Sequence, residues 1–249
     1  AFDTIGADFI RDIEPGEVVA IDENGVNTIL KSAKEKRNCL FEFIYLARPD
    51  SYIEGRSIYQ SRFRAGKELY REFKTDGDIV IGAPDSGIVA AIGYAEESGI
   101  PYAEGMIKNR YVGRTFIQPT QELREQGLRI KLNALKENIN NKRIILVDDS
   151  IVRGTTLKRT VDMLKRAGAK EVHVRISSPP VTNPCHLGID TPSKENLIAA
   201  NMTIDKIREE INADSLYYLS LDGLIKSIGK DCGFCTGCFT GKYPISMDN

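Results

Sequence analysis

The chain has 249 residues, of which 41% are hydrophobic and 28% are charged, so it is long enough to bury a core and to form one large domain or one domain with part of another. Its formal net charge of −1 excludes the strong basic field that gathers nucleic acid or acidic lipid. Because no apolar run reaches membrane-spanning length and the first residues lack the pattern of a signal peptide, we expect a cytoplasmic protein without nucleic-acid or membrane partners.

The first segment of the chain predicts a β-hairpin. Two β-rich runs, 17–21 and 26–30, are separated by the turn sequence Asp-Glu-Asn-Gly, and the charged stretch 31–38 that follows is typical of a linker. A lone hairpin is only marginally stable in water. We therefore expect residues 1–37 to be the remnant of an N-terminal domain with its linker, and residues 38–249 to form the main domain. The chain begins with Ala1 rather than Met, which agrees with a processed or truncated chain or with a cloning boundary.

Beyond the linker, strand-like and helix-like segments alternate. The first helix would carry an apolar face of Tyr59, Phe63, Gly66, Tyr70 and Phe73. Such alternation predicts the α/β class, with a mostly parallel sheet flanked by helices and right-handed connections. In sheets of this kind, ligands bind beyond the carboxyl ends of the strands. We expect strands at residues 40–45, 78–81, 143–147 and 171–176, helices at 57–73, 87–97 and 155–167, and a long polar helix or a pair of helices at 121–138.

The stretch 143–156, Arg-Ile-Ile-Leu-Val-Asp-Asp-Ser-Ile-Val-Arg-Gly-Thr-Thr, carries the strongest functional signal. Its apolar run predicts a buried strand that ends at two adjacent acids, Asp148 and Asp149. Gly154 allows a ligand to approach the backbone closely, and Thr155 and Thr156 bring hydroxyl and amide groups to a helix N-terminus, where a phosphate is favoured. The acids suit two sugar hydroxyls or a hydrated Mg²⁺. A bare acid pair would more often belong to an ordinary polar turn, and the spacing of a Walker A loop is absent.

Taken as a whole, that stretch resembles the phosphoribosyl pyrophosphate (PRPP) motif of type I phosphoribosyltransferases. Three further segments, 43–51, 107–119 and 237–244, resemble the amidophosphoribosyltransferase family. The resemblance runs from about residue 40 to residue 244, and the first thirty-odd residues look like the end of that family's N-terminal glutaminase domain of the Ntn type. It implies the type I phosphoribosyltransferase fold.

The resemblance also implies an activity, a pentosyl transfer. Ammonia, normally released from glutamine by the other domain, displaces pyrophosphate from PRPP and gives 5-phosphoribosylamine, the first step of de novo purine biosynthesis. Purine nucleotides are then expected as feedback inhibitors, and a homo-oligomer, a dimer or tetramer, as the assembly. With nearly all of the glutaminase domain missing, we expect activity with ammonia but not with glutamine.

The resemblance assigns the PRPP site to two loops. In isolation, the Pro-Asp-Ser-Gly sequence after the strand at 78–81 is an ordinary type I turn. Within the family it holds the pyrophosphate and its Mg²⁺, although some relatives carry a hydroxyl where this chain has Gly87. Asp148, Asp149 and Ser86, or water in place of Ser86, would then bind Mg²⁺. The expected substrate-binding residues are Asp85, Ser86, Gly87, Asp148, Asp149, Ser150, Ile151, Val152, Arg153, Gly154, Thr155 and Thr156.

Residues 108–119 mix cations with aromatic and apolar residues around a glycine. By itself this composition is typical of a solvated charged loop. The resemblance implies a lid whose residues Lys108, Arg110, Tyr111 and Arg114 act in catalysis, with the cations clamping the diphosphate leaving group. Tyr111 and Ile117 would line an ammonia channel between the domains.

The five cysteines do not suggest a disulfide framework, because their number is odd and three of them crowd into one tail. The Cys-x-x-Cys spacing of that tail fits a Zn²⁺ site or an iron–sulfur cluster about equally. The resemblance favours the iron–sulfur subtype, in which Cys39, Cys185, Cys235 and Cys238 hold a structural 4Fe-4S cluster. Cys232 is then a spare thiol that could exchange with Cys235. Zn²⁺ remains the alternative.

Two other functions use the same PRPP motif. A PRPP-sensing regulatory protein would bind the ligand without catalysis, but the chain lacks a helix-turn-helix start and a basic patch. A purine-salvage phosphoribosyltransferase would transfer the sugar to a base, but the cysteine tail and the Arg-Tyr-Val-Gly-Arg sequence of the lid argue against it. The histidines His173 and His186 are expected to be structural.

Overall fold

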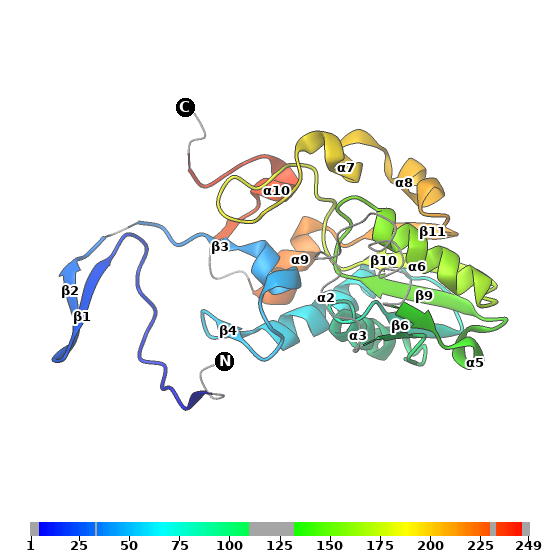
Figure 1. Cartoon of the computed structure of the whole chain (residues 1–249), viewed down its shortest axis with the longest axis horizontal. Coiled ribbons are helices and arrows are strands. Elements are labelled where there is room, and N and C mark those ends of the chain that lie inside the picture. Colours follow the sequence, from blue (N-terminus) through cyan, green and yellow to red (C-terminus); the bar gives the residue numbers. More distant parts are fainter. Residues whose placement is uncertain (1–4, 33, 110–131, 230–232, 246–249) are drawn as a thin grey trace, which may run out of the picture.

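The structure, a computed structural model, describes residues 5–32, 34–109, 132–229 and 233–245. At its centre lies a four-stranded parallel sheet in the order β11-β10-β9-β6 (Figure 1). Strands β9 and β10 pair along their whole length, from Arg143 opposite Glu171 to Asp148 opposite Ile176. The α/β class with a mostly parallel sheet is confirmed. The four strands are β6 (Ile79–Gly82), β9 (Arg143–Asp148), β10 (Glu171–Ile176) and β11 (Ser215–Tyr218).

Helices cover both faces of this sheet, and each face has its own core. The side chains of β9 alternate, so Ile144 and Leu146 pack into one core while Ile145 and Val147 pack into the other. All four are fully buried, as expected for a central parallel strand covered on both sides. The first core lies under α5 (Lys136–Ile139), α6 (Thr155–Arg166), α7 (Ile198–Asn201) and α8 (Ile204–Glu210); the second lies under α2 (Ile58–Glu72), α3 (Ile88–Ser98) and α9 (Leu221–Ile228).

The first long helix, α2, forms where the sequence predicts it. Ser57 caps its N-terminus by accepting a hydrogen bond from Gln60 N at 3.2 Å. Its buried face matches the expected one only in part, since Gly66 is buried and Tyr70 packs against the core. Tyr59 is 39% exposed, and its ring stacks on Phe63, while the buried side is formed by Ile58, Ser61, Arg62, Ala65, Gly66, Glu68 and Leu69.

Helices α2 and α3 approach so closely that each needs a glycine at the contact. A methyl group on Gly66 would overlap the carbonyl oxygen of Ala90, and one on Gly93 would overlap the carbonyl oxygen of Phe63. Both obstacles are backbone atoms, which cannot rotate away as a flexible side chain can. The two glycines therefore set the distance between the helices, and α3 in turn holds the loop that follows β6.

Two expected elements differ from the structure. The residues predicted as a strand at 40–45 form a short π-helix, Glu42–Leu46, after the two-residue strand β3 (Asn38–Cys39). The reason is Arg62 of α2, which donates to Phe43 O at 2.9 Å and Ala47 O at 2.8 Å. The guanidinium satisfies carbonyl groups that a strand would have paired with a neighbouring strand.

The helix or pair of helices expected at 121–138 is wrong at residues 132–134 and right at residues 136–138, and residues 121–131 lie outside the described part of the chain. Leu132–Ala134 forms strand β8, antiparallel to β7 (Met106–Lys108), and only Lys136–Ile139 is helical. The partner of β8 lies some 25 positions earlier in the chain, so the local sequence gives no sign of this ladder. Two further small pairs are β4 (Tyr52–Ile53) with β5 (Arg56–Ser57), and β3 with β12 (Phe234–Cys235), which precedes the one-turn helix α10 (Gly237–Thr240); a 3-10 turn spans Lys194–Asn196.

The predicted N-terminal hairpin is confirmed as β1 (Val18–Asp22) paired with β2 (Gly25–Leu30). It extends away from the body of the molecule (Figure 1), and β2 is exposed along its whole length. Its apolar side chains have little to pack against, since Ile21 is 75% and Ile29 is 69% exposed. The domain boundary between residues 37 and 38 stays a prediction.

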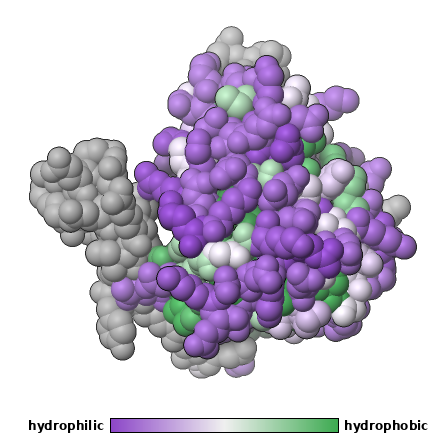
Figure 2. Space-filling view, turned by 90° about the vertical axis from the view of Figure 1, so that its right-hand side faces the viewer, coloured by the Kyte–Doolittle hydropathy of each residue, from purple (hydrophilic) through white to green (hydrophobic). Residues whose placement is uncertain are grey.

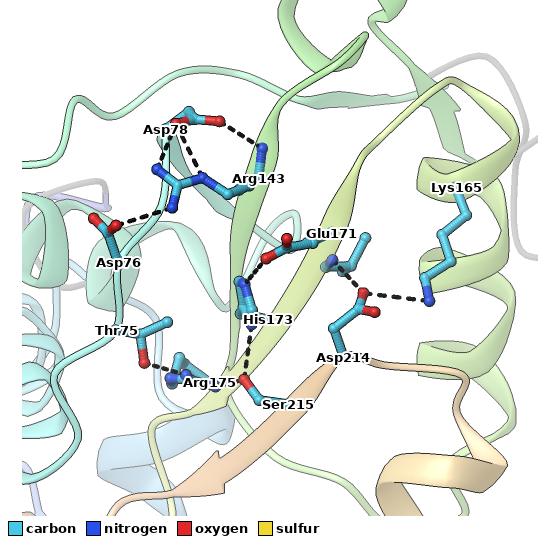
Figure 3. Close-up of polar contacts among 11 residues, drawn as sticks. Thr75, Asp76, Asp78, Arg143, Lys165, Glu171, His173, Arg175, Asp214 and Ser215 are labelled. Atoms are coloured by element: carbon cyan, nitrogen blue, oxygen red, sulfur yellow. Dashed lines mark hydrogen bonds and ion pairs between the residues drawn. The ribbon is translucent and has the colours of Figure 1, made fainter.

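Polar contacts tie the amino ends of the central strands together (Figure 3). Arg143 of β9 donates to Asp78 at 2.9 Å and to Asp76 at 2.9 Å. His173 has a partner on each ring nitrogen, Ser215 Oγ at 2.9 Å and Glu171 Oε2 at 2.9 Å, as a structural histidine would. This network therefore lies at the edge of the sheet opposite the carboxyl ends, where ligands are expected.

The surface is mostly polar. On the face seen in Figure 2, hydrophilic residues predominate and apolar residues occur in small patches. Within the described part of the chain, no helix combines the length and the apolar character needed to cross a membrane.

We predict that Gly93→Ala destabilises the fold by about 1–3 kcal/mol, because the added methyl group meets backbone of α2 and forces the helices apart. Gly77→Ala is the matched control, since its methyl group would meet mainly the side chain of Ile145. Urea denaturation of both variants measures the difference. Equal losses of stability would show that the α2–α3 contact is not the constraint described here.

Candidate functional site

The candidate site lies at the carboxyl end of β9, where Asp148 and Asp149 follow the buried apolar run. Asp149 is 6% exposed and accepts two hydrogen bonds, from Ser86 Oγ at 2.5 Å and from Ser150 Oγ at 2.6 Å. Asp148 Oδ1 accepts a hydrogen bond from the backbone N–H of Asp149 at 2.8 Å. The two acids are thus held by different groups, and Asp149 joins the loop after β9 to the loop after β6.

The environment of the pair changes the acidity of one member. Burial raises the pKa of Asp148 well above its ordinary value, and the neighbouring Asp149 carboxylate raises it further. One acid of the pair therefore keeps its proton more readily than an exposed aspartate. A cation or a set of hydroxyl donors placed between the two carboxyls would reverse this effect, because it stabilises the charged form.

The loop after β6 reaches the acids because Gly87 lies against the end of β9. A Cβ on Gly87 would be 2.5 Å from Val147 O and 3.0 Å from Ala83 N and O, so no larger residue fits. Ala83 N also donates to Val147 O at 2.8 Å. Position 87 therefore carries no hydroxyl, and Ser86 supplies the hydroxyl next to the acid pair.

The loop 150–154 leads from the acids into α6. Gly154 has φ 78°, a left-handed conformation, and a Cβ there would also meet Ile198 Cδ1 at 2.8 Å, so the position requires glycine. Having no side chain, Gly154 makes no side-chain cap for the first amide groups of α6. Ile151 is 2% exposed and belongs to the core, whereas Arg153, Thr155 and Thr156 are exposed beside the helix N-terminus. The loop and the first turn of α6 thus combine backbone amide groups, the hydroxyls of Thr155 and Thr156 and the cation of Arg153, which suits a phosphate.

An open cleft of about 930 Å³ adjoins the loop after β6. It is bordered by Asp85 of that loop and by Lys108 of β7, which form an ion pair at 2.6 Å. Both side chains are exposed, at 75% and 47%. Tyr102 and Glu104, which the sequence analysis did not single out, also line the cleft. Of the expected lid residues, only Lys108 can be placed; Arg110, Tyr111, Arg114 and Ile117 lie outside the described residues.

A second candidate site gathers four cysteines from three distant segments. Parallel pairing of β3 with β12 puts Cys39 directly opposite Cys235. Cys238 follows in α10, and its carbonyl oxygen accepts from Thr182 N and Asn183 N, both at 3.0 Å, which brings in the Pro-Cys segment with Cys185. All four cysteines are half-buried free thiols, and Cys232 lies outside the described residues.

The pKa shifts of the thiols agree with the proximity of the four cysteines. Burial, with smaller contributions from the nearby Cys39, Cys235 and Cys185, raises the pKa of Cys238 to about 12. Burial also raises the pKa of Cys39, whereas hydrogen bonds from the backbone of Phe41 and Glu42 oppose that rise. Leu187 N donates to Cys185 Sγ at 3.4 Å. Within the described residues, no three His, Cys, Asp or Glu side chains are close enough to hold a single metal ion.

One residue near the site was missed by the sequence analysis. Arg62 is 5% exposed, and its charge interacts with that of Asp149, although its hydrogen bonds go to the π-helix. Burial lowers the pKa of Arg62. A signal was available, because Ile58, Arg62, Ala65 and Leu69 follow the helical period of a buried face, on which an arginine is unusual.

Comparison with known proteins agrees with this geometry. Residues 50–177, which include the loop after β6 and the acid pair, match the family described as phosphoribosyl transferase domain. Three curated proteins named amidophosphoribosyltransferase match 99% of this chain: those of Synechocystis sp. at 56% identity, Archaeoglobus fulgidus at 54% and Bacillus subtilis at 53%. The chain spans only about half of their length, from 50% to 55%.

Two solved structures resemble the whole chain. One, described as the structure of the allosteric regulatory enzyme of purine biosynthesis, has a TM-score of 0.92 at 52% identity; the chain covers 55% of it. The other, glutamine PRPP amidotransferase from B. subtilis complexed with ADP and GMP, has a TM-score of 0.91 at 52% identity, and the chain covers 56% of it. This chain therefore belongs to the phosphoribosyl transferase domain family, and its relatives over the full sequence are amidophosphoribosyltransferases.

Proposed function

We propose that this chain is the part of an amidophosphoribosyltransferase that binds PRPP and replaces its pyrophosphate by ammonia. One observation carries the proposal: Ser86 of the loop after β6 donates to Asp149, which directly precedes the glycine-bearing turn into α6. The N-terminus of α6, which can bind an anion, the acid pair Asp148 and Asp149, and the loop after β6 thus lie around a single site. The names of relatives with more than 50% identity support the same reaction and its role in purine biosynthesis.

Different residues of the chain bind different parts of PRPP. The amide groups at the start of α6, with Thr155 and Thr156, bind the 5-phosphate. Asp148 and Asp149 accept hydrogen bonds from the ribose hydroxyls or bind Mg²⁺, together with Ser86. Mg²⁺ supplies positive charge that neutralises the pyrophosphate as it leaves. Among the described residues, the carboxylate oxygens of Asp148 and Asp149 and the hydroxyl of Ser86 are ligands of the kind that Mg²⁺ prefers, so this donor set fits the ion.

In the reaction, the nitrogen of ammonia forms a bond to the anomeric carbon while the bond from that carbon to pyrophosphate breaks. The bonding electrons leave with pyrophosphate, and the new ammonium group then loses a proton. As in other sugar transfers, positive charge develops on the ring in the transition state, which Asp148 and Asp149 stabilise. Lys108 gives up its ion pair with Asp85 and binds the leaving diphosphate instead. Arg110, Tyr111 and Arg114 are the expected further residues of the lid.

We also propose that Cys39, Cys185, Cys235 and Cys238 hold a structural 4Fe-4S cluster. Backbone N–H groups directed at Cys39 and Cys185 support this, since such bonds stabilise thiolate ligands of clusters. A zinc ion is the alternative. The arrangement of the thiols in the sequence, with Cys39 after the linker, Cys185 in a Pro-Cys segment and a C-terminal Cys-x-x-Cys, supports the cluster over the zinc ion.

The remaining partners follow from the relatives. Purine nucleotides are proposed as inhibitors because the B. subtilis structure is described as a complex with ADP and GMP. Glutamine would supply the ammonia through the part of the relatives that this chain does not span, and a homo-oligomer, a dimer or tetramer, is proposed as the assembly. The PRPP-sensing and salvage functions have no specific observation in their favour.

The first prediction concerns the nitrogen source. The chain supplied with PRPP, Mg²⁺ and ammonium salt should release pyrophosphate, whereas glutamine should not replace ammonium, because the polypeptide tested spans only about half of its relatives' length. A coupled pyrophosphate assay measures both rates. Release of glutamate from glutamine by this polypeptide alone would contradict the prediction, and saturable PRPP binding without any pyrophosphate release would favour a sensor.

The second prediction uses the acidity of Asp148. In the unfolded chain Asp148 loses its proton near pH 4, whereas in the native protein it keeps that proton to higher pH. The bound proton therefore contributes to stability at low pH, and this contribution is lost as the pH rises from about 4 through the raised pKa of Asp148. Asparagine carries no such charge and keeps the oxygen that accepts from Asp149 N. Asp148→Asn should therefore raise the free energy of unfolding above neutral pH, on the order of 1 kcal/mol, and reduce PRPP binding at least tenfold.

Denaturation curves at several pH values and calorimetric titration with PRPP measure these two effects. The exposed change Asp22→Asn is the control and should alter neither, because Asp22 lies in the hairpin and only accepts from Asn24 N. If Asp148→Asn lowers stability or leaves PRPP affinity unchanged, the role assigned to the acid pair is wrong.

The third prediction concerns the cysteines. Protein purified without oxygen should be brown and contain iron and sulfide, and Cys238→Ser should lose both. Cys232→Ser should retain them, because Cys232 is the spare thiol. Metal analysis of the three proteins decides the question, and stoichiometric zinc without iron would replace the cluster by the zinc alternative.

A further inference from the structure

The segment after the last cysteine turns back over the cysteine site. Helix α10 ends at Gly241, which has φ 74° and so reverses the direction of the chain. Two residues later Tyr243 is half-buried, although Lys242 and Pro244 on either side of it are exposed. In Figure 1 this end of the chain lies beside the loop that follows β10. A tyrosine is therefore held against that loop by an exposed tail.

On one side, Tyr243 contacts the residues that flank Cys185. Its hydroxyl donates a hydrogen bond of 2.5 Å to the carbonyl oxygen of Pro184. Its ring stands edge-on to the ring of His186, with the centroids 5.1 Å apart and the planes at 71°. Pro184 and His186 are the immediate neighbours of Cys185, so the tyrosine fixes the backbone before that cysteine and the side chain after it.

On the other side, Tyr243 packs against the residue that precedes Cys238. A methyl group on Gly237 would overlap ring carbons Cδ1 and Cε1 of Tyr243, so glycine is what allows the ring to lie there. The proximity is also electrostatic: burial raises the pKa of Tyr243, and Cys238, Cys185 and Cys235 add to the rise. One side chain thus contacts the neighbours of two cysteines from separate segments.

The other bonds between these segments involve main-chain groups of the tail. Cys238 O accepts from Thr182 N and Asn183 N, and Thr182 Oγ1 donates to Phe239 O at 2.9 Å. These bonds lie two or three residues before Cys185. Tyr243 is a tail side chain that contacts both immediate neighbours of Cys185.

We propose that Tyr243 is a positioning residue of the cysteine site, which holds the segment of Cys185 against Cys238 and covers the thiols from solvent reagents. The hydroxyl fixes Cys185 through Pro184, and the ring covers the gap between the two segments. This role exists in the metal-free chain, so it does not require the identity of the bound metal. Its effect on a cluster rests on the proposed function.

The direct test is the reactivity of the thiols in the metal-free full chain. Tyr243→Phe keeps the ring and loses the bond to Pro184, and Tyr243→Ala loses both. We expect Cys185 to react with a disulfide reagent several-fold faster in the first variant and at least tenfold faster in the second, with mass spectrometry assigning the labelled site. Tyr52→Phe is the control, because Tyr52 is 73% exposed and should not alter the rate. Unchanged labelling of Cys185 in both variants would overturn the proposal.

A second test separates positioning from a general loss of folding. Gly237→Ala should displace the ring and increase labelling of Cys185 about as much as Tyr243→Ala. In the Tyr243→Ala background the same glycine change should have little further effect, because no ring remains to be displaced. Additive effects of the two changes would overturn the proposed contact.

Iron retention is the third readout. In protein that holds the cluster, a strong iron chelator should remove iron several-fold faster from Tyr243→Phe than from the unsubstituted chain, whereas equal rates would overturn the role in protecting a cluster. If the unsubstituted chain contains no iron, the proposed cofactor fails, and thiol labelling still decides the role of Tyr243.

Discussion

The candidate site depends on the contact between the loop after β6 and the end of β9. Gly87 lies so close to Val147 O that a side chain would collide with it, and this closeness lets Ser86 reach Asp149. Parallel neighbours in a sheet bring their carboxyl ends to one edge, but not automatically within hydrogen-bond distance. The contact turns two separate loops into a single site. The close packing of α2 on α3 at Gly66 and Gly93 supports this contact, because α3 begins directly after Gly87.

Much of this arrangement could be predicted from sequence, for physical reasons. Residues 144–147 predicted a buried strand because a central parallel strand is apolar on both faces, and Gly154 predicted a loop that a ligand can approach closely because glycine has no side chain. The π-helix at Glu42–Leu46 could not be predicted, since its carbonyl groups are satisfied by Arg62, a residue far along the chain. The bond from Ser86 to Asp149 is equally non-local, so only the resemblance to a family joined those loops.

The cysteines show the same limit. The spacing of Cys235 and Cys238 indicates a metal centre by itself, but Cys39 and Cys185 stand alone in the sequence and no local pattern connects them to the tail. In the structure, a ladder of only two residue pairs puts Cys39 opposite Cys235. Main-chain bonds to Cys238 O then bring the Pro-Cys segment close. The cysteine site is assembled from short segments that lie far apart in the sequence. Its formation therefore depends on tertiary packing, which local propensity does not reveal.

The ion pair between Lys108 and Asp85 has a consequence for which anions the cleft admits. While the pair is closed, the cation is masked by its own neighbour, so an approaching anion meets a surface that is nearly neutral at this point. An exposed pair of this kind contributes at most about 1 kcal/mol, so a polyanion with several simultaneous contacts can open it at little cost. An anion that replaces Asp85 as the partner of Lys108 must therefore offset only this small cost, so the closed pair keeps the cation paired until such a ligand arrives.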